Sequence, residues 1–166
     1  MKIKALDIAV PLVGALTFLF ALIQLPVWAL FIGWAWYYAF GAQPGAFKTA
    51  LPPTFLGAAM AILCFIMIDI MAPAVPAIPA TMIGLFVTLF ILMMVLKIPA
   101  FSASLPAFNA YSCFFVGFAY KTYMEVQGMP PLLNGLIWIT GANILGLVAG
   151  WVSIEVEKGL KKVMKE

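Results

Sequence analysis

The chain consists of long apolar segments separated by short breaks that are rich in proline and glycine. The apolar segments cover residues 5–24, 26–42, 51–71, 77–97, 104–121 and 131–154. A helix that crosses the hydrocarbon core of a bilayer needs about 20 mainly apolar residues. Proline has no N–H to continue a helix, so its place in the breaks fits helix ends. The pattern predicts an all-α integral membrane protein with six transmembrane helices.

Composition supports a membrane location and excludes several functions. Of the 166 residues, 66% are hydrophobic and 9% are charged, whereas soluble domains have about 45–50% apolar and about 25% charged residues. Residues 1–154 are therefore predicted to form a single polytopic domain. Histidine is absent, and no catalytic triad, metal cluster or pair of carboxylates at catalytic spacing is recognisable. We expect no enzyme, cofactor or metal site, and no nucleic-acid partner, because the lysines form no basic face.

The distribution of lysines predicts the topology. With six spans and a cytoplasmic N-terminus, only Lys121 lies outside the cell. The remaining lysines then lie on the cytoplasmic side: Lys2, Lys4, Lys48, Lys97, Lys158, Lys161, Lys162 and Lys165. This strong bias agrees with the positive-inside rule and places both termini in the cytoplasm. Residues 155–166 are predicted to continue the last helix as a basic cytoplasmic tail.

Two breaks share a sequence pattern. "GAFKTALPPTFLG" at residues 45–57 and "PAFSASLPAFN" at residues 99–109 both contain Ala-Phe followed by Leu-Pro. One interpretation is a parallel repeat in which proline opens a helix and Thr49 and Ser104 cap it. A second interpretation is ordinary loop composition, and a third is an inverted repeat of spans 1–3 and 4–6. Whether the two segments re-enter the membrane stays open.

Residues 19–59, from "LFALIQLPVW" to "PPTFLGAA", carry a resemblance that extends over most of the chain. The chain resembles a family of small bacterial inner-membrane proteins of unassigned function and of about this length. More loosely, the same stretch resembles half of a urea channel. Urea channels are oligomers that hold their substrate between stacked phenylalanines. The resemblance thus implies a multi-pass protein of the bacterial inner (cytoplasmic) membrane, a homo-oligomer and a urea-like solute.

Five residues near the two similar breaks are candidates for a solute path. They are Phe47, Thr54, Phe101, Phe108 and Asn109. A pair of aromatic rings can gate a pore while stacking a flat, uncharged solute, and neutral polar groups can bind it. The alternatives are rings that face lipid or the core, and an asparagine that bonds to a neighbouring helix.

Two further sets of residues complete the candidates. Asp69 is an acidic residue inside an apolar segment, which makes it a functional candidate. It has three possible roles: attracting cations at the external mouth, pairing with Lys121, or carrying a proton. Ala142, Gly146 and Gly150 are spaced by four and form a narrow stripe for close packing of a neighbouring helix.

The sequence therefore favours a channel or facilitator for a small neutral or weakly charged solute, such as urea, another amide or ammonia. The protein would act as a homo-oligomer in the lipid bilayer. The alternatives are a structural or accessory membrane subunit that transports nothing, and a proton-coupled transporter that uses Asp69.

Overall fold

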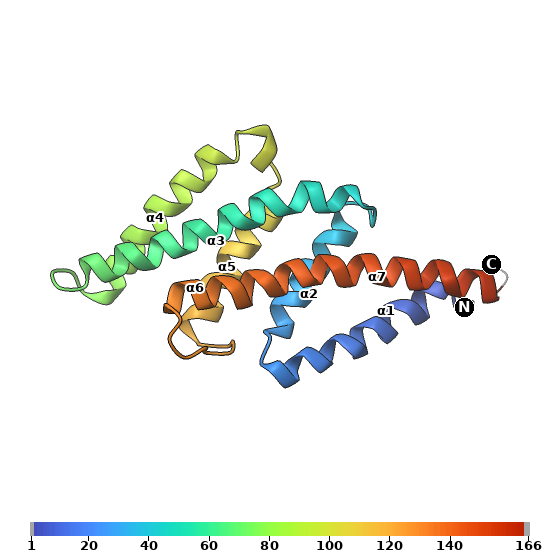
Figure 1. The fold of residues 1–166 in the computed structure, drawn as a ribbon. Helices are drawn as coiled ribbons and strands as arrows, with labels where there is room; N and C mark the ends of the chain where they lie inside the picture. Colours follow the sequence, from blue (N-terminus) through green and yellow to red (C-terminus); the bar gives the residue numbers. More distant parts are fainter. Residues whose placement is uncertain (1, 165–166) are drawn as a thin grey trace.

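The computed structural model describes residues 2–164, and within this range the chain forms six helical segments and no strand (Figure 1). The segments are α1 (Ala5–Thr17) with the 3-10 helix η1 (Phe18–Ile23), α2 (Val27–Ala39), α3 (Gly45–Met71), α4 (Ala77–Val95), α5 (Ser104–Ala119) preceded by the 3-10 helix η2 (Pro99–Phe101), and α6 (Pro131–Gly135) continued by the π-helix η3 (Leu136–Thr140) and by α7 (Gly141–Met164). The all-helical fold class is confirmed. Met1, Lys165 and Glu166, at the ends of the predicted domain and tail, lie outside the described residues.

Four of the helical segments are long and apolar enough to cross a membrane. They are Ala5–Ile23, Gly45–Met71, Ala77–Val95 and Pro131–Met164. The other two, α2 and α5, have 13 and 16 residues. At 1.5 Å per residue these rise about 20 and about 24 Å, less than the hydrocarbon core of about 30 Å. The helices indicate a multi-pass membrane protein in which the second and fifth segments are unusually short.

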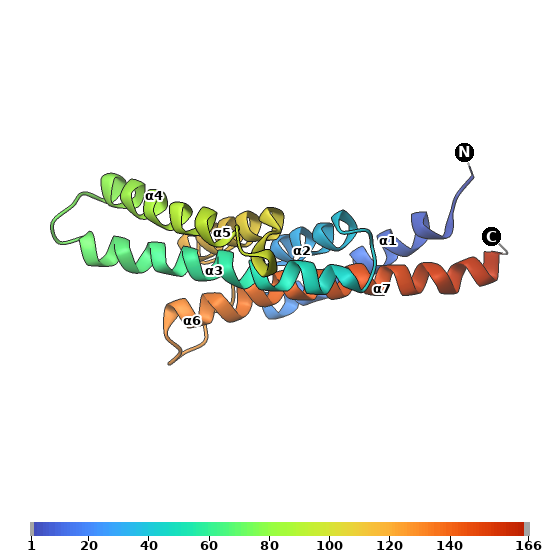
Figure 2. The ribbon, with the colours of Figure 1, turned by 90° about the horizontal axis from the view of Figure 1, so that it is seen from above.

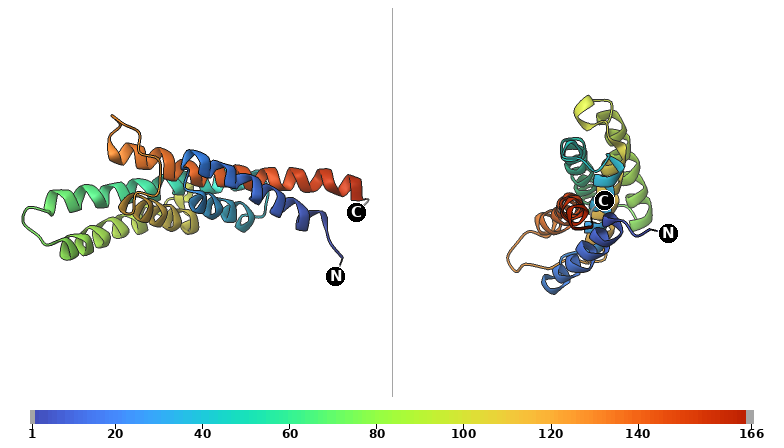
Figure 3. Two further views of the ribbon diagram at one scale, coloured as in Figure 1. Left: turned by 90° about the horizontal axis from the view of Figure 1, so that it is seen from below. Right: turned by 90° about the vertical axis from the view of Figure 1, so that its right-hand side faces the viewer.

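The helices pack as an elongated bundle with the short ones inside it. The helix α7 packs along α2 and α1, while α3 packs along α5 and α4. The beginning of α1 and the end of α7 lie at one end of the bundle (Figures 1 and 2). The connections from α3 to α4 and from α5 to α6 lie toward the opposite end, as Figure 3 also shows. Each short helix is therefore held by a long helix from the other half of the chain.

The first of the two similar breaks differs from its prediction. The helix α3 begins at Gly45 rather than at residue 51, so Pro52 and Pro53 lie inside it. The hydroxyl of Thr49 donates to the carbonyl of Gly45 in the same helix and caps nothing. A proline pair normally breaks a helix, but Ala46, Ala50 and Pro53 are buried by packing, and this tertiary contact holds the segment in helical form.

The second break agrees better with the pattern. A turn of 3-10 helix, η2, precedes α5, and Pro106 lies in the first turn of α5, where a missing N–H is tolerated. The predicted cap is wrong, however. The residue before α5 is Ala103, which supplies no side-chain bond, and the hydroxyl of Ser102 donates to the carbonyl of Pro99 at 3.0 Å.

Three glycines bring helices into backbone contact. A Cβ on Gly33 of α2 would overlap the carbonyl oxygen of Asn143 on α7. A Cβ on Gly146 of α7 would overlap the carbonyl oxygen of Leu30 on α2. A Cβ on Gly57 of α3 would overlap the carbonyl oxygen of Ala107 on α5 in the same way. Such contacts are typical of membrane helices that approach through small residues.

The stripe of small residues on α7 lies at the contact between α7 and α2. A Cβ on Gly150 would come within 2.6 Å of the Cβ of Tyr37 on α2, and Ala142 is fully buried. The neighbouring helix at Gly146 and Gly150 is therefore α2 of the same chain.

Candidate functional site

Two sets of polar contacts link neutral groups of α2, α5 and α7, and we call them together the central polar cluster: Trp36, Asn109, Cys113, Asn143 and the carbonyl of Ala29. The indole Nε1 of Trp36 donates to Oδ1 of Asn109 at 2.9 Å. The amide Nδ2 of Asn143 donates to the carbonyl of Ala29 at 2.7 Å and lies 3.6 Å from Sγ of Cys113. The cluster thus joins helices from both halves of the chain without using a charged side chain.

Asn143 has unused hydrogen-bonding capacity. The residue is fully buried, and its Oδ1 has no hydrogen-bond partner among residues 2–164. A buried acceptor without a partner costs about 1–3 kcal/mol. The π-helix η3 ends at Thr140, three residues before Asn143, and π-helical turns often occur at functional sites. The cluster therefore contains a buried acceptor whose hydrogen-bonding capacity is not used by residues 2–164.

A second polar contact joins α4 to α5. The hydroxyls of Thr88 and Tyr111 lie 2.9 Å apart, and Thr88 also donates to the carbonyl of Gly84 at 2.8 Å. The proton between the two hydroxyls therefore comes from Tyr111. Both residues are buried, with Thr88 fully so, and the bond fixes the ring of Tyr111 against α4.

The structure separates the residues predicted to line a solute path. The ring of Phe47 packs edge-on against Tyr37, with centroids 5.7 Å apart. Thr54 is fully buried and its hydroxyl donates to Ala50 of its own helix. Phe101 lies on η2 and Phe108 lies in an outer groove. Of the five, only Asn109 belongs to the central polar cluster.

Asp69 is exposed near the end of α3. Lys121, the lysine considered as its partner, forms an ion pair with Glu125, with 3.1 Å between Nζ and Oε1. A neighbour four residues away in the chain is reached more easily than Asp69 on another helix. The predicted pair of Asp69 with Lys121 is therefore not present in the structure.

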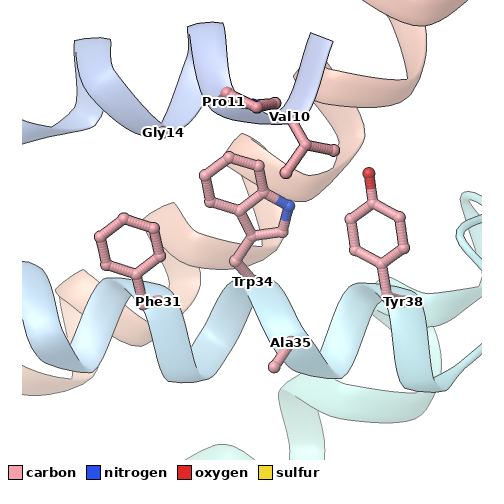
Figure 4. A pocket seen from close by; sticks show the side chains of 7 residues that line it. All are labelled: Val10, Pro11, Gly14, Phe31, Trp34, Ala35 and Tyr38. Carbon is pink, nitrogen blue, oxygen red and sulfur yellow. The ribbon is translucent and has the colours of Figure 1, made fainter. Parts of the chain in front are cut away.

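Two of the open grooves along the bundle are each lined by one of the short helices. The larger, of about 550 Å³, runs between α1 and α2, and Trp34 and Tyr38 point from α2 toward α1 (Figure 4). Its lining residues are Val10, Pro11, Gly14, Phe31, Trp34, Ala35 and Tyr38. The smaller, of about 300 Å³, lies between α4 and α5 and is lined by Leu85, Leu89, Phe108, Tyr111, Ser112, Phe115 and Val116. The two short helices line these grooves with residues of identical spacing along the chain: Phe31, Trp34, Ala35 and Tyr38 on α2, and Phe108, Tyr111, Ser112 and Phe115 on α5.

Comparison with known families gives one assignment. Residues 5–158 match DUF1097, which is described as a protein of unknown function. The chain belongs to the DUF1097 family. Comparisons of this DUF1097 chain with curated proteins and with solved structures give no significant match. The predicted membership of a family of unassigned function is confirmed, and the likeness to a urea channel stays a prediction.

Sequence reasoning on this DUF1097 chain missed Trp36, Cys113 and Thr88. Each makes its polar contact with a residue that is distant in the sequence, such as Asn109 for Trp36. No local pattern signals such a pair, because it depends on how two helices align. Trp36 is 1% exposed, although a tryptophan in a short apolar segment is more typical of the membrane interface.

Proposed function

We propose that the protein is a channel or facilitator for a small neutral or weakly charged solute, with all six helical segments crossing the membrane. The observation that carries the proposal is the pair of short helices, α2 and α5. Each is the second of three segments in its half of the chain, and the two are joined by the bond between Trp36 and Asn109. Paired short segments at corresponding positions point to the binding site in transporters built from inverted repeats.

The two helix crossings support an inverted repeat. In each crossing, a Cβ on the glycine would overlap a carbonyl oxygen of the short helix and the backbone nitrogen one turn later. For Gly146 these atoms belong to Leu30 and Trp34 of α2. For Gly57 they belong to Ala107 and Tyr111 of α5. Because three helices form each half, the second half enters the membrane in the opposite direction. Of the two repeats that the sequence left open, the packing favours the inverted one.

The chemistry of the cluster favours a neutral solute. Its groups are an indole N–H, two amides, a thiol and a carbonyl oxygen. A charged solute would need a charged or strongly hydrated site, since charge is expensive near the centre of a bilayer. Urea, other amides and ammonia are small and carry N–H groups that match the free Oδ1 of Asn143.

The remaining expectations form part of the same proposal. Both ends of the chain lie at one end of the bundle (Figure 1), which supports an even number of spans, and the lysine bias favours cytoplasmic termini in a bacterial inner membrane. A unit of 166 residues is small for a transport protein, so we propose a homo-oligomer.

The test is solute flux into proteoliposomes, measured by light scattering with urea, acetamide and glycerol. Loaded vesicles should equilibrate at least one of these solutes about tenfold faster than empty vesicles. Asn109→Leu, which removes the bond to Trp36, should slow this flux. Thr81→Val is the matched control, because the hydroxyl of Thr81 is exposed and donates within its own helix. Equal rates in loaded and empty vesicles for all three solutes would reject the proposal.

The same preparation distinguishes the alternatives. A partner protein that stays bound in mild detergent, together with no flux, would favour an accessory subunit. Proton coupling requires flux that responds to a pH gradient and loses this response in Asp69→Asn. Flux that is independent of the gradient in both proteins would exclude coupling through Asp69.

A further inference from the structure

A polar cleft of about 380 Å³ lies between the connection from α5 to α6 and the first residues of α6, at the beginning of the last candidate membrane span. Its volume falls at the lower end of the range for small-molecule sites, about 300–1,000 Å³. The lining residues are Lys121, Tyr123, Glu125, Val126, Gln127, Met129, Pro131 and Asn134. This connection lies toward the end of the bundle opposite the termini (Figures 1 and 3), so the polar cleft is separate from the central polar cluster.

Asn134 gives the polar cleft a fixed acceptor. It is 3% exposed, and its Nδ2 donates to the carbonyl of Met124 at 3.0 Å. Its backbone N–H donates to Pro130 at 2.9 Å, which anchors the residue in the first turn of α6. The Oδ1 of Asn134 has no partner within residues 2–164. A buried carbonyl oxygen that is held in place without a partner favours a ligand with an N–H donor.

Charges of both signs lie beside this acceptor. Lys121 and Glu125 form an ion pair of 3.1 Å, and their side chains are 72% and 59% exposed. Exposed pairs of this kind contribute little to stability, so a ligand can replace the pair at small cost. A ligand that carries both an ammonium and a carboxylate leaves the net charge of the polar cleft unchanged when it does so. The ring of Tyr123 stacks on Phe118, which holds the phenol against the cleft wall.

We propose that the polar cleft binds a small zwitterion with an ammonium and a carboxylate group, of the α-amino acid type. Its ammonium group is held by Glu125 and by Oδ1 of Asn134. Its carboxylate is held by the ammonium of Lys121 and by the hydroxyl of Tyr123. A simple anion or cation would satisfy only one of these charges, and a neutral amide would satisfy neither. The proposal concerns binding and does not depend on transport through the central polar cluster.

Isothermal titration of the full-length protein in mild detergent tests the proposal. The probes are glycine and L-alanine, with methylammonium, acetate and acetamide as partial analogues. We expect at least one zwitterion to bind about tenfold or more tightly than every analogue. Binding of an analogue as tight as that of the zwitterions, or no binding of either zwitterion, would overturn the assignment. A failed flux assay does not affect this result, because no transport is measured.

Charge-neutralising variants locate the binding. Glu125→Gln and Lys121→Gln change exposed side chains and should each weaken zwitterion binding about tenfold or more. The matched control is Glu155→Gln, which disrupts a similar exposed pair with Lys158 of 2.7 Å on α7 and should leave binding unchanged. Asn134→Ala should also weaken binding. If that variant does not fold, Glu125→Gln and Lys121→Gln still test the site. Equal affinity in Glu125→Gln and wild type would reject the site.

Discussion

Both helix crossings bring a glycine against a backbone oxygen of the other helix, but they differ in their polar chemistry. At the crossing of α7 over α2, Asn143 lies three residues before Gly146 and donates to Ala29 of the other helix. At the crossing of α3 over α5, Thr54 lies three residues before Gly57 and donates to Ala50 of its own helix. Close packing is therefore common to both halves, whereas of these two side chains only Asn143 donates its hydrogen bond to the other helix. Two crossings with similar backbone geometry can thus differ in the hydrogen bonds that their side chains make.

The largest effect is expected when the glycines themselves are changed. Gly57→Ala and Gly146→Ala should each destabilise the fold by roughly 2–4 kcal/mol, since the new Cβ overlaps a backbone oxygen that cannot move alone. Equilibrium unfolding in mixed detergent micelles measures this. Gly141→Ala is the matched control, because its Cβ would meet nothing within 4 Å. If one glycine tolerates alanine and the other does not, the two crossings are not equivalent.

The next largest effect is a difference in stability loss between variants at the two crossings. Asn143→Leu should destabilise the protein by about 1 kcal/mol, a typical value for a hydrogen bond between membrane helices. Thr54→Val should change stability by less than about 0.5 kcal/mol, since its hydroxyl bonds only within its helix. The same unfolding assay applies to both variants. Equal losses would contradict the polar difference between the crossings.

A smaller difference is expected between the first and fourth helical segments. Thr17 and Thr88 both donate to the carbonyl of a glycine in their own helix, at 2.7 and 2.8 Å. Of these two hydroxyls, only that of Thr88 also bonds to a second helix, through the hydroxyl of Tyr111 on α5. Thr88→Val should therefore cost about 0.6 kcal/mol more than Thr17→Val. The two unfolding curves measure the difference directly, and identical curves would show that the bond to Tyr111 adds nothing.

The smallest effect appears only at alkaline pH. Burial, followed by the negative charge of Glu125, raises the pKa of Tyr123 above its usual 10.0. The neutral phenol is thus favoured in the folded state, so its contribution is present below about pH 10 and is lost as pH rises through the folded pKa. Tyr123→Phe should remove this part of the alkaline loss of stability. The corresponding connection in the first half of the chain, from α2 to α3 at residues 40–44, contains no ionisable side chain, so it makes no comparable contribution at alkaline pH.

Unfolding midpoints measured from neutral to strongly alkaline pH check this effect. Glu125→Gln serves as the partial control, because it removes the neighbouring charge and leaves the burial in place. It should reduce the alkaline loss without abolishing it. Parallel pH profiles for wild type and Tyr123→Phe would mean that Tyr123 makes no such contribution.

Much of the fold was predictable from the sequence, but little of the site was. The six helical segments follow from apolar runs that end at proline and glycine, and α5 begins at Ser104, where the pattern places it. The start of α3 at Gly45 was not predictable, because packing of Ala46 and Ala50 outweighs the local effect of two prolines. The central polar cluster was hidden for a related reason: Asn109 and Trp36 are far apart in the chain and meet only when α2 and α5 align.

The amino-acid sequence is sufficient to specify a helical, apolar chain that is divided into six segments. These properties depend on composition and on local breaks, since each backbone group in a bilayer must find its partner within its own helix. Which helices cross, and where polar groups of different helices bond, follows from the packing of the folded chain. A glycine such as Gly57 permits close approach to any neighbour, and the choice of α5 as that neighbour depends on the packing of all the helices together.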